Sequence, residues 1–174
     1  SEAEEIAKEV EKRIRELLDR VRRMVEESEK YARDSLRKIK RLLDEVRRRI
    51  EELLRKIRRD GPTEELRKEL ERIKEEIDEL LKKIRKENED AHRRSKELID
   101  RMKEELDKIK EEIDRKNLPS EVAKKVKELL DEVERILREW EKEDRRLLKE
   151  SEDLLREVEK EVRKLLRRVE EELK

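Results

Sequence analysis

Apolar residues recur every three or four positions along almost the whole chain, and this spacing constrains the fold more than any other feature. In the series Leu66, Ile84 and Met102, five such steps lead from each residue to the next, and five steps also lead from Ala3 to Val21. This interval, the 18-residue repeat, gives the natural α-helical value of 3.6 residues per turn. A heptad coiled coil keeps 3.5 residues per turn and supercoils to the left. We therefore expect long α-helices that run nearly straight.

Two short segments interrupt the pattern and predict tight turns between helices. In the first, Gly61 can adopt the left-handed conformation after a helix end, Pro62 cannot continue a helix, and Thr63 can cap the next one. The second segment, residues 117–120, repeats this logic with Asn117, a proline and a predicted hydroxyl cap at Ser120. The chain therefore contains three helical segments.

The ends of these segments predict the domain organisation. Ser1 and Glu4 have the spacing of a capping box, so the first helix should start at once. The predicted helices cover about residues 1–59, 63–116 and 120–174 of a single domain spanning residues 1–174. Connections of three or four residues force neighbouring helices to run antiparallel. The predicted fold class is all-α: an elongated up-down-up antiparallel three-helix bundle with nearly straight helices of about 55 residues.

The width of the apolar stripe bears on the oligomeric state. Doubled positions such as Leu17-Leu18 and Leu53-Leu54 widen the stripe beyond two residues in seven. That width suits a helix that contacts two partners within its own chain. Since the sequence contains no second apolar face, we expect a very stable monomer without protein partners.

The charge pattern argues against nucleic acid as a ligand. Charged residues make up 61% of the chain, but Lys plus Arg and Asp plus Glu both number 53, so the formal net charge is zero. Nucleic-acid affinity depends largely on an excess of positive charge. The two signs are mixed along every segment, as on solvated helix faces with pairs of opposite charge one turn apart.

Several other classes are excluded by what the sequence lacks. The chain has no Cys, so it has no disulfide framework and no thiolate chemistry. The longest uninterrupted apolar runs are two residues, too short to span a bilayer or to form a signal-peptide core. No targeting signal indicates a compartment, and the localisation stays unknown. The first residue is Ser rather than Met, from which we expect a processed or tag-cleaved recombinant product.

The 18-residue repeat, the nearly equal helices, the Gly-Pro-Thr and Leu-Pro-Ser turns and the Glu, Lys, Arg and Asp surface together resemble de novo, parametrically designed, untwisted single-chain three-helix bundles. The resemblance covers the whole chain. It implies a designed structural scaffold that has no natural biochemical activity and is not an enzyme.

Three windows break the apolar stripe with polar or aromatic residues: Ser28 to Ser35, Asn88 to Ser95, and Trp140 to Ser151. The only Tyr, His and Trp of the chain fall in these windows. Because the turns fix how the helices align, facing core positions should add to about 123 between the first two helices and about 235 between the last two. The resulting layers are Ser28 with Ser95 and Trp140; Tyr31 or Ala32 with Ala91 or His92 and Asp144; Ser35 with Asn88 and Leu147 or Leu148; and Ile39 with Ile84 and Ser151.

A buried polar group without a hydrogen bond costs about 1 to 3 kcal/mol, so a run of such groups predicts mutual hydrogen bonding. We expect Asp144 to accept hydrogen bonds from His92 and Tyr31, and Asn88 to bridge to Ser35. Such partners match in one register only, and designed bundles with buried hydrogen-bond networks, which these layers resemble, use them to specify helix register and pairing. The predicted network residues are Ser28, Tyr31, Ser35, Asn88, His92, Ser95, Trp140, Asp144 and Ser151.

The same layers allow sharper functional interpretations. Small residues beside Trp140 would leave room for a small aromatic ligand, and the single His92 would make a pH-responsive layer. A relay in which Asp144 orients His92 and a hydroxyl acts as nucleophile would give a hydrolase-like site. Against catalysis, no Gly-rich turn or helix N-terminus lies at this depth to supply oxyanion donors. We expect no metal, because His92 is the only histidine, and no cofactor.

Overall fold

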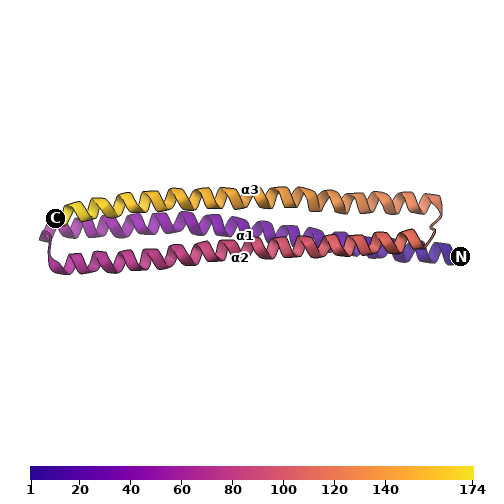
Figure 1. Cartoon of the computed structure of the whole chain (residues 1–174), viewed down its shortest axis with the longest axis horizontal. Coiled ribbons are helices and arrows are strands. Elements are labelled where there is room, and N and C mark those ends of the chain that lie inside the picture. The colour runs from indigo at the N-terminus through magenta and orange to yellow at the C-terminus, as the bar shows by residue number, and fades with distance from the viewer. The chain divides into compact units, whose positions relative to one another are not determined.

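The computed structural model describes residues 1–174, apart from the side chain of Ala3, as three α-helices joined by two short turns (Figure 1). The helices are α1 (Glu2–Asp60), α2 (Glu64–Arg115) and α3 (Ser120–Glu172). The described residues contain no β-strand. The predicted all-α class and three-helix bundle are therefore confirmed. The predicted inward position of Ala3 lies outside the described side chains.

The chain divides into two compact units, and the boundary between them falls inside each of the three helices. Unit 1 comprises Ser1–Tyr31 and Ala91–Arg146, and unit 2 comprises Ala32–Asp90 and Leu147–Lys174. Each unit therefore contains one segment of α1, one of α2 and one of α3. The single domain over the whole chain stays a prediction.

Neighbouring helices run antiparallel within each unit. In unit 2, Lys38 on α1 forms an ion pair with Glu87 on α2, whereas Lys56, further along α1, pairs with Glu69, which comes earlier in α2. In unit 1 the ion pairs between α2 and α3 show the same relation. This direction agrees with the up-down order that the short connections predict.

The chemistry of the first two helix starts follows the sequence prediction. Ser1 caps α1, since its Oγ accepts a hydrogen bond from the backbone N–H of Glu4 at 3.4 Å. Gly61 has a φ of +78° in the first turn, the left-handed conformation that glycine adopts without strain. Thr63 caps α2, because its Oγ1 accepts a hydrogen bond from the backbone N–H of Leu66 at 3.3 Å.

The second turn differs from the prediction at one residue. Asn117 is left-handed as expected, with a φ of +45°. Ser120, however, is already the first helical residue of α3, and the carbonyl of Pro119 accepts the first backbone hydrogen bond, from Ala123 at 2.8 Å. The helix starts directly after the proline, so its N-cap position falls on Pro119 and not on Ser120. The prediction placed the cap one residue too late.

A long side chain from α2 caps the C-terminal end of α3. The last turn of α3 contains no basic residue. Instead, the Arg67 guanidinium on α2 donates a hydrogen bond to the backbone carbonyl of Leu173 at 2.9 Å. A cation at this end both satisfies an unpaired carbonyl and interacts favourably with the helix dipole.

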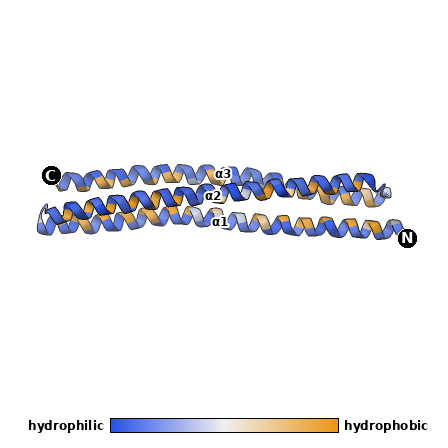
Figure 2. Ribbon diagram, turned by 60° about the horizontal axis from the view of Figure 1, so that its bottom comes forward, coloured by the Kyte–Doolittle hydropathy of each residue, from blue (hydrophilic) through white to orange (hydrophobic). Residues whose placement is uncertain are grey.

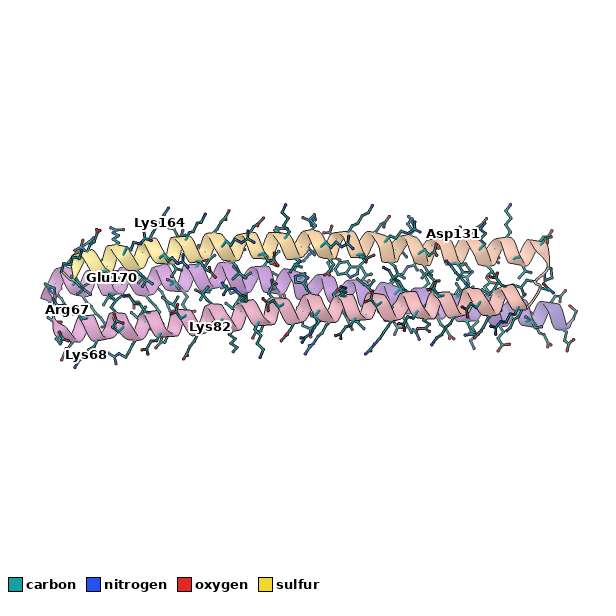
Figure 3. All side chains as sticks on the ribbon, viewed as in Figure 1. Arg67, Lys68, Lys82, Asp131, Lys164 and Glu170 are labelled. Atoms are coloured by element: carbon teal, nitrogen blue, oxygen red, sulfur yellow. The ribbon has the colours of Figure 1, made fainter. Side chains whose placement is uncertain are left out.

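Each unit has its own apolar core. In unit 1, Ile14, Val21 and Val133 are completely buried. In unit 2, Ile39 and Ile50 are completely buried, within a cluster of residues from all three helices. Hydrophobic residues lie on the sides of the helices that face their neighbours, and hydrophilic residues lie on the outer sides (Figure 2). The outer residues include the exposed Lys82, Asp131 and Lys164, which Figure 3 labels.

The steps of three or four residues from Leu66 to Ile84 pass through Leu80 and predict an inward position for it, and this prediction is wrong. Leu80 is 36% exposed, whereas Leu81 packs against the core of unit 2. The reason is helix geometry, because residues one repeat apart share one side of a helix. Leu81 lies one repeat before Ile99, which is 2% exposed.

Candidate functional site

Trp140 and Ser95 form a buried polar pair in unit 1. Trp140 on α3 is 3% exposed and Ser95 on α2 is 4% exposed. The indole Nε1–H of Trp140 donates a hydrogen bond to the Ser95 Oγ at 3.2 Å. A buried N–H without an acceptor would cost about 1 to 3 kcal/mol. Ser95 therefore makes the only tryptophan of the chain compatible with the core.

His92 and Asp144 form a second polar pair in unit 1. The His92 Nδ1 lies 3.2 Å from the Asp144 Oδ1, and the two side chains are 9% and 13% exposed. The carboxylate favours an imidazole that carries a proton on Nδ1 and donates it to Oδ1. In the described hydrogen bonds Ser95 pairs with Trp140 and His92 pairs with Asp144, so the carboxylate, imidazole and serine are not linked in series.

A chain of three hydrogen bonds crosses unit 2. The Ser35 hydroxyl on α1 donates to the Asn88 Oδ1 on α2 at 2.8 Å, and the Asn88 Nδ2 donates to the Ser151 Oγ on α3 at 2.9 Å. The Ser151 hydroxyl in turn donates to the backbone carbonyl of Leu148 at 2.8 Å. One polar side chain from each helix thus takes part.

The direction of donation along this chain is set by its last member. Because the Ser151 hydroxyl donates its single hydrogen bond to the Leu148 carbonyl, its oxygen must accept a hydrogen bond from the Asn88 amide. The Asn88 carbonyl oxygen then faces α1, where the Ser35 hydroxyl can only be the donor. Asn88 and Ser151 are 2% and 1% exposed, so protein groups rather than water satisfy them.

Most predicted network residues stand where the helix repeat elsewhere has an apolar residue. Positions one repeat earlier and one repeat later share their side of the helix. These equivalents are Val10 and Val46 for Ser28, Leu17 and Leu53 for Ser35, Leu70 and Leu106 for Asn88, Ile77 and Ile113 for Ser95, Val122 and Val158 for Trp140, Val126 and Val162 for Asp144, and Val133 and Val169 for Ser151. Seven polar or aromatic residues therefore occupy core positions.

The prediction that Tyr31 belongs to the buried network is wrong. Tyr31 is 63% exposed, so it is not a buried partner of Asp144. Its equivalents one repeat away are Arg13 and Arg49, whose side chains pair with glutamates on α2. Tyr31 therefore occupies a position at the edge of the core, and Ala32, which is 6% exposed, fills the core position beside it.

His92 is buried as predicted, but it does not stand at an apolar position of the repeat, and Ser28 is less buried than predicted. The equivalents of His92 are Lys74 and Lys110, which reach from α2 to glutamates on α3, so His92 approaches Asp144 from the flank of its helix. Ser28 is partly buried and partly exposed. Water can therefore satisfy its hydroxyl group.

Two contributors to the candidate site were not predicted from the sequence. One is the Leu148 carbonyl, and the signal that points to it is general: a serine inside a helix often donates to a carbonyl three or four residues earlier. The other is the ion pair between Lys103 and Glu141, at 2.9 Å, which joins α2 to α3 next to Trp140. The hydrogen bond from Lys103 lowers the pKa of the Glu141 carboxyl below its ordinary value.

None of the predicted network residues lines a described surface hollow. One is lined by Glu64, Arg67 and neighbouring charged residues of α2, and another by charged residues of α3 that include Asp131. Among the described residues, no group of three or more His, Asp or Glu side chains is arranged to hold a metal ion. No described helix is both long and apolar enough to cross a membrane. The ligand-pocket and relay alternatives stay predictions.

Comparison with known proteins finds a matching family and a similar solved structure. A family model described as the C terminus of G protein-coupled receptor kinase-interacting protein 1 matches residues 36–134, from the middle of α1 through all of α2 into α3. This is more than half of the chain. By this match, the chain belongs to that family. No significant sequence match was found among curated proteins.

A solved structure shares the fold. It is described as a computationally designed three helix bundle, and it superposes on this chain with a TM-score of 0.58 and 20% sequence identity. The alignment covers 99% of this chain and 89% of that chain. At this level of identity the likeness concerns the fold alone, which is again a three-helix bundle.

Proposed function

We propose that the chain is a monomeric, non-enzymatic structural scaffold of designed origin, and that its buried polar residues specify helix register and pairing. The observation that carries this proposal is the chain of hydrogen bonds from Ser35 through Asn88 and Ser151 to the Leu148 carbonyl. It involves all three helices of unit 2. Each described donor in it meets an acceptor.

Register specificity follows from the geometry of these bonds. An apolar stripe with an 18-residue repeat offers similar packing after a shift of one or two turns, because Leu, Ile and Val recur at equivalent positions. Asn88 meets a hydroxyl on each side in one alignment only. After a shift it would face apolar residues, at a cost of about 1 to 3 kcal/mol for each orphaned group. The polar residues therefore penalise misaligned helices more than they stabilise the aligned ones.

Designed origin is supported by two features of the sequence and by the similar solved structure. The 18-residue repeat continues through each helix, and charged residues make up 61% of the chain. The solved structure that shares the fold carries the words "computationally designed" in its description. A scaffold requires only that the bundle form in one arrangement, which is the property that matched polar groups provide.

The helix register can be tested in a variant whose turns no longer fix the alignment of the helices. Both turns are replaced by flexible Gly-Ser linkers of about twelve residues, so that the connections no longer fix the alignment. Cysteine pairs then report the register between α1 and α2, because the described residues contain no other cysteine. The native pair is Arg49→Cys with Glu76→Cys, at an ion-paired position. Shifted pairs are Arg49→Cys with Glu69→Cys or Lys83→Cys.

The chain itself supplies the matched control for the polar residues. The triple variant Ser35→Leu, Asn88→Leu, Ser151→Val inserts the apolar residue that is found one repeat away from each position. With the polar residues present, we expect cross-linking of the native pair alone. In the triple variant the shifted pairs should cross-link as well. A triple variant that keeps one register, or a polar chain that shifts, would overturn the proposal. Sedimentation of the unmodified chain as a dimer would refute the monomer.

A partner-binding role is the second candidate, because the matching family description names a protein that interacts with a receptor kinase. The large hydrophobic residues that are exposed among those described are Tyr31 and Leu80. They belong to different units, and neither forms part of a described apolar groove. Fluorescence anisotropy of the labelled chain, titrated with a purified G protein-coupled receptor kinase, tests this role. Saturable binding that Tyr31→Ser or Leu80→Ser weakens would favour it over the scaffold.

A further inference from the structure

In the five described ion pairs between α1 and α2, the cation lies on α1 and the anion on α2. In unit 1, α1 supplies the cation and α2 the anion in the pairs Arg13 with Glu112 and Arg20 with Glu105. In unit 2, the pairs Lys38 with Glu87, Arg49 with Glu76 and Lys56 with Glu69 have the same polarity. These cations form the basic flank of α1, and these glutamates form the acidic flank of α2.

In the four described ion pairs between α2 and α3, the cation lies on α2 and the anion on α3. In unit 1, α2 supplies the cation in the pairs Lys103 with Glu141 and Lys110 with Glu134. In unit 2, it does so in the pairs Lys74 with Glu170 and Arg85 with Glu159. Glu170 of α3 is labelled in Figure 3. The four cations of these pairs form the basic flank of α2, and their four glutamate partners form the acidic flank of α3. Helix α2 therefore carries opposite charges on its two flanks.

The ion pairs between α1 and α3 are of mixed polarity. Arg22 on α1 pairs with Glu132 at 3.0 Å, and Arg47 on α1 pairs with Glu161 at 3.7 Å. In unit 1 the pair between Lys125 and Glu11 has the reverse polarity. Two of these three pairs still place the cation on α1.

An apolar stripe cannot determine the direction in which three helices wind around their common axis. In both directions the same side of each helix faces the core, but the two flanks exchange neighbours. With the opposite winding, the acidic flank of α2 would meet Glu132 and Glu161 of α3, which carry the same charge. The basic flank of α2 would meet Arg22 and Arg47 of α1, again with the same charge. The basic flank of α1 would still meet the acidic flank of α3.

We propose that the oppositely charged flanks of α2 select the direction of winding in each unit. The observed winding brings opposite charges together in the nine described pairs at the two interfaces of α2, whereas the opposite winding brings mostly like charges together there. Single exposed ion pairs contribute little, but nine pairs with a common polarity act together. This inference concerns the charged flanks and not the buried polar residues, so either proposal can fail without the other.

The test exchanges the charges of the two α2 flanks in the full chain. In the flank-exchanged variant, the five glutamates of the acidic flank become Lys and the four cations of the basic flank become Glu. The observed winding then becomes repulsive at both α2 interfaces, and the opposite winding becomes attractive. A compensated variant also reverses the basic flank of α1 and the acidic flank of α3, which restores attraction in the observed winding. A control variant reverses nine exposed charges on the outer faces, including Lys82, Asp131 and Lys164.

Cysteine pairs distinguish the two windings in unit 1. The pair at positions 20 and 105 replaces an ion pair of the observed winding. The pair at positions 20 and 134 would come together only in the opposite winding, since Glu134 now faces Lys110 on α2. A short bismaleimide cross-linker, followed by mass spectrometry, gives the ratio of the two products.

The proposal predicts that the unmodified and compensated chains cross-link at 20 and 105. The flank-exchanged chain should cross-link at 20 and 134, with a ratio changed by about tenfold or more. Continued cross-linking of the flank-exchanged chain at 20 and 105 overturns the proposal. If that chain does not fold, the compensated variant decides: recovery of the native cross-link supports the proposal. Failure of the compensated variant, or equal damage in the outer-face control, overturns it.

Discussion

Asn88 is the residue whose replacement tests the buried polar chain of unit 2 most sharply. The change Asn88→Ala removes the acceptor of the Ser35 hydroxyl and the donor to the Ser151 Oγ. Ser151 keeps its bond to the Leu148 carbonyl but loses the hydrogen bond that its oxygen accepts. The change also leaves a small cavity, because the residue is 2% exposed.

These losses add to a measurable destabilisation. Two hydrogen bonds contribute about 1 kcal/mol each. Ser35 is partly exposed, so water offsets part of its loss, whereas Ser151 is 1% exposed and has no such access. With the cavity included, we expect Asn88→Ala to lower the free energy of unfolding by about 2 to 4 kcal/mol.

The triple variant Ser35→Leu, Asn88→Leu, Ser151→Val should behave in the opposite way. It removes every polar partner together and inserts residues whose equivalents are almost fully buried, such as Leu70 and Leu106. Replacing all the partners leaves no orphaned group, so we expect the stability to be unchanged or raised. Guanidinium denaturation, followed by far-UV circular dichroism, measures both variants. A silent Asn88→Ala, or a triple variant as unstable as the single one, would refute the reasoning.

Three further predictions concern other parts of the chain. Tyr31→Ala should change the free energy of unfolding by less than about 0.5 kcal/mol in the same denaturation assay, because the ring is 63% exposed; a large loss would mean that the ring is buried in solution. Trp140→Phe should cost about 1 to 3 kcal/mol by removing the bond to Ser95, and adding Ser95→Ala should recover part of it; additive losses would contradict the pairing. The hydrogen bond from Lys103 lowers the pKa of Glu141 below its ordinary value in the folded chain, so the stabilisation is present above the unfolded pKa and is lost as the pH falls through the folded one. Lys103→Met should therefore reduce stability by up to about 1 kcal/mol near pH 7 and leave it unchanged near pH 2, in denaturation curves at the two pH values.

The fold was predictable because local signals and long-range pattern agree. Gly61 and Asn117 mark both turns, and the apolar spacing between them allows only long helices. The layer rule also paired Ser35 with Asn88 and Ser95 with Trp140, and these side chains are hydrogen-bonded in the structure. It was wrong for Ser151, which it placed one layer away with Ile39 and Ile84, because Ser151 accepts a hydrogen bond from Asn88. Tight turns fix the alignment of facing helices, so residue numbers alone can locate partners across them.

The errors arise where two adjacent residues compete for one core position. Steps of three or four residues assign Tyr31 and Leu80 to the core, whereas Ala32 and Leu81 occupy it. A difference of one residue rotates a side chain by about 100°, which moves it from the core to its edge. Comparison at 18-residue intervals would have separated Tyr31 from Ala32, since Tyr31 aligns with Arg13 and Arg49 whereas Ala32 aligns with Ile14 and Ile50. It would not have separated Leu80, which aligns with Leu98.

Other features depend on atoms that a sequence pattern does not represent. The acceptor at the end of the unit 2 chain is a backbone carbonyl, that of Leu148, which every residue possesses. The cap on α3 comes from Arg67, far away in the sequence, and surface arginines are too numerous for one to be singled out. Likewise, the sign of the charge on each helix flank can be assigned only when the ion pairs between the helices are known.

The Asn88 amide joins polar residues of all three helices in the core of unit 2. Nuclear magnetic resonance of the Asn88 side-chain amide tests it most directly. We expect slow hydrogen exchange of the Nδ2 protons and through-space contacts from this amide to both Ser35 and Ser151. Rapid exchange at the rate of a solvated amide, or contacts to neither serine, would contradict it.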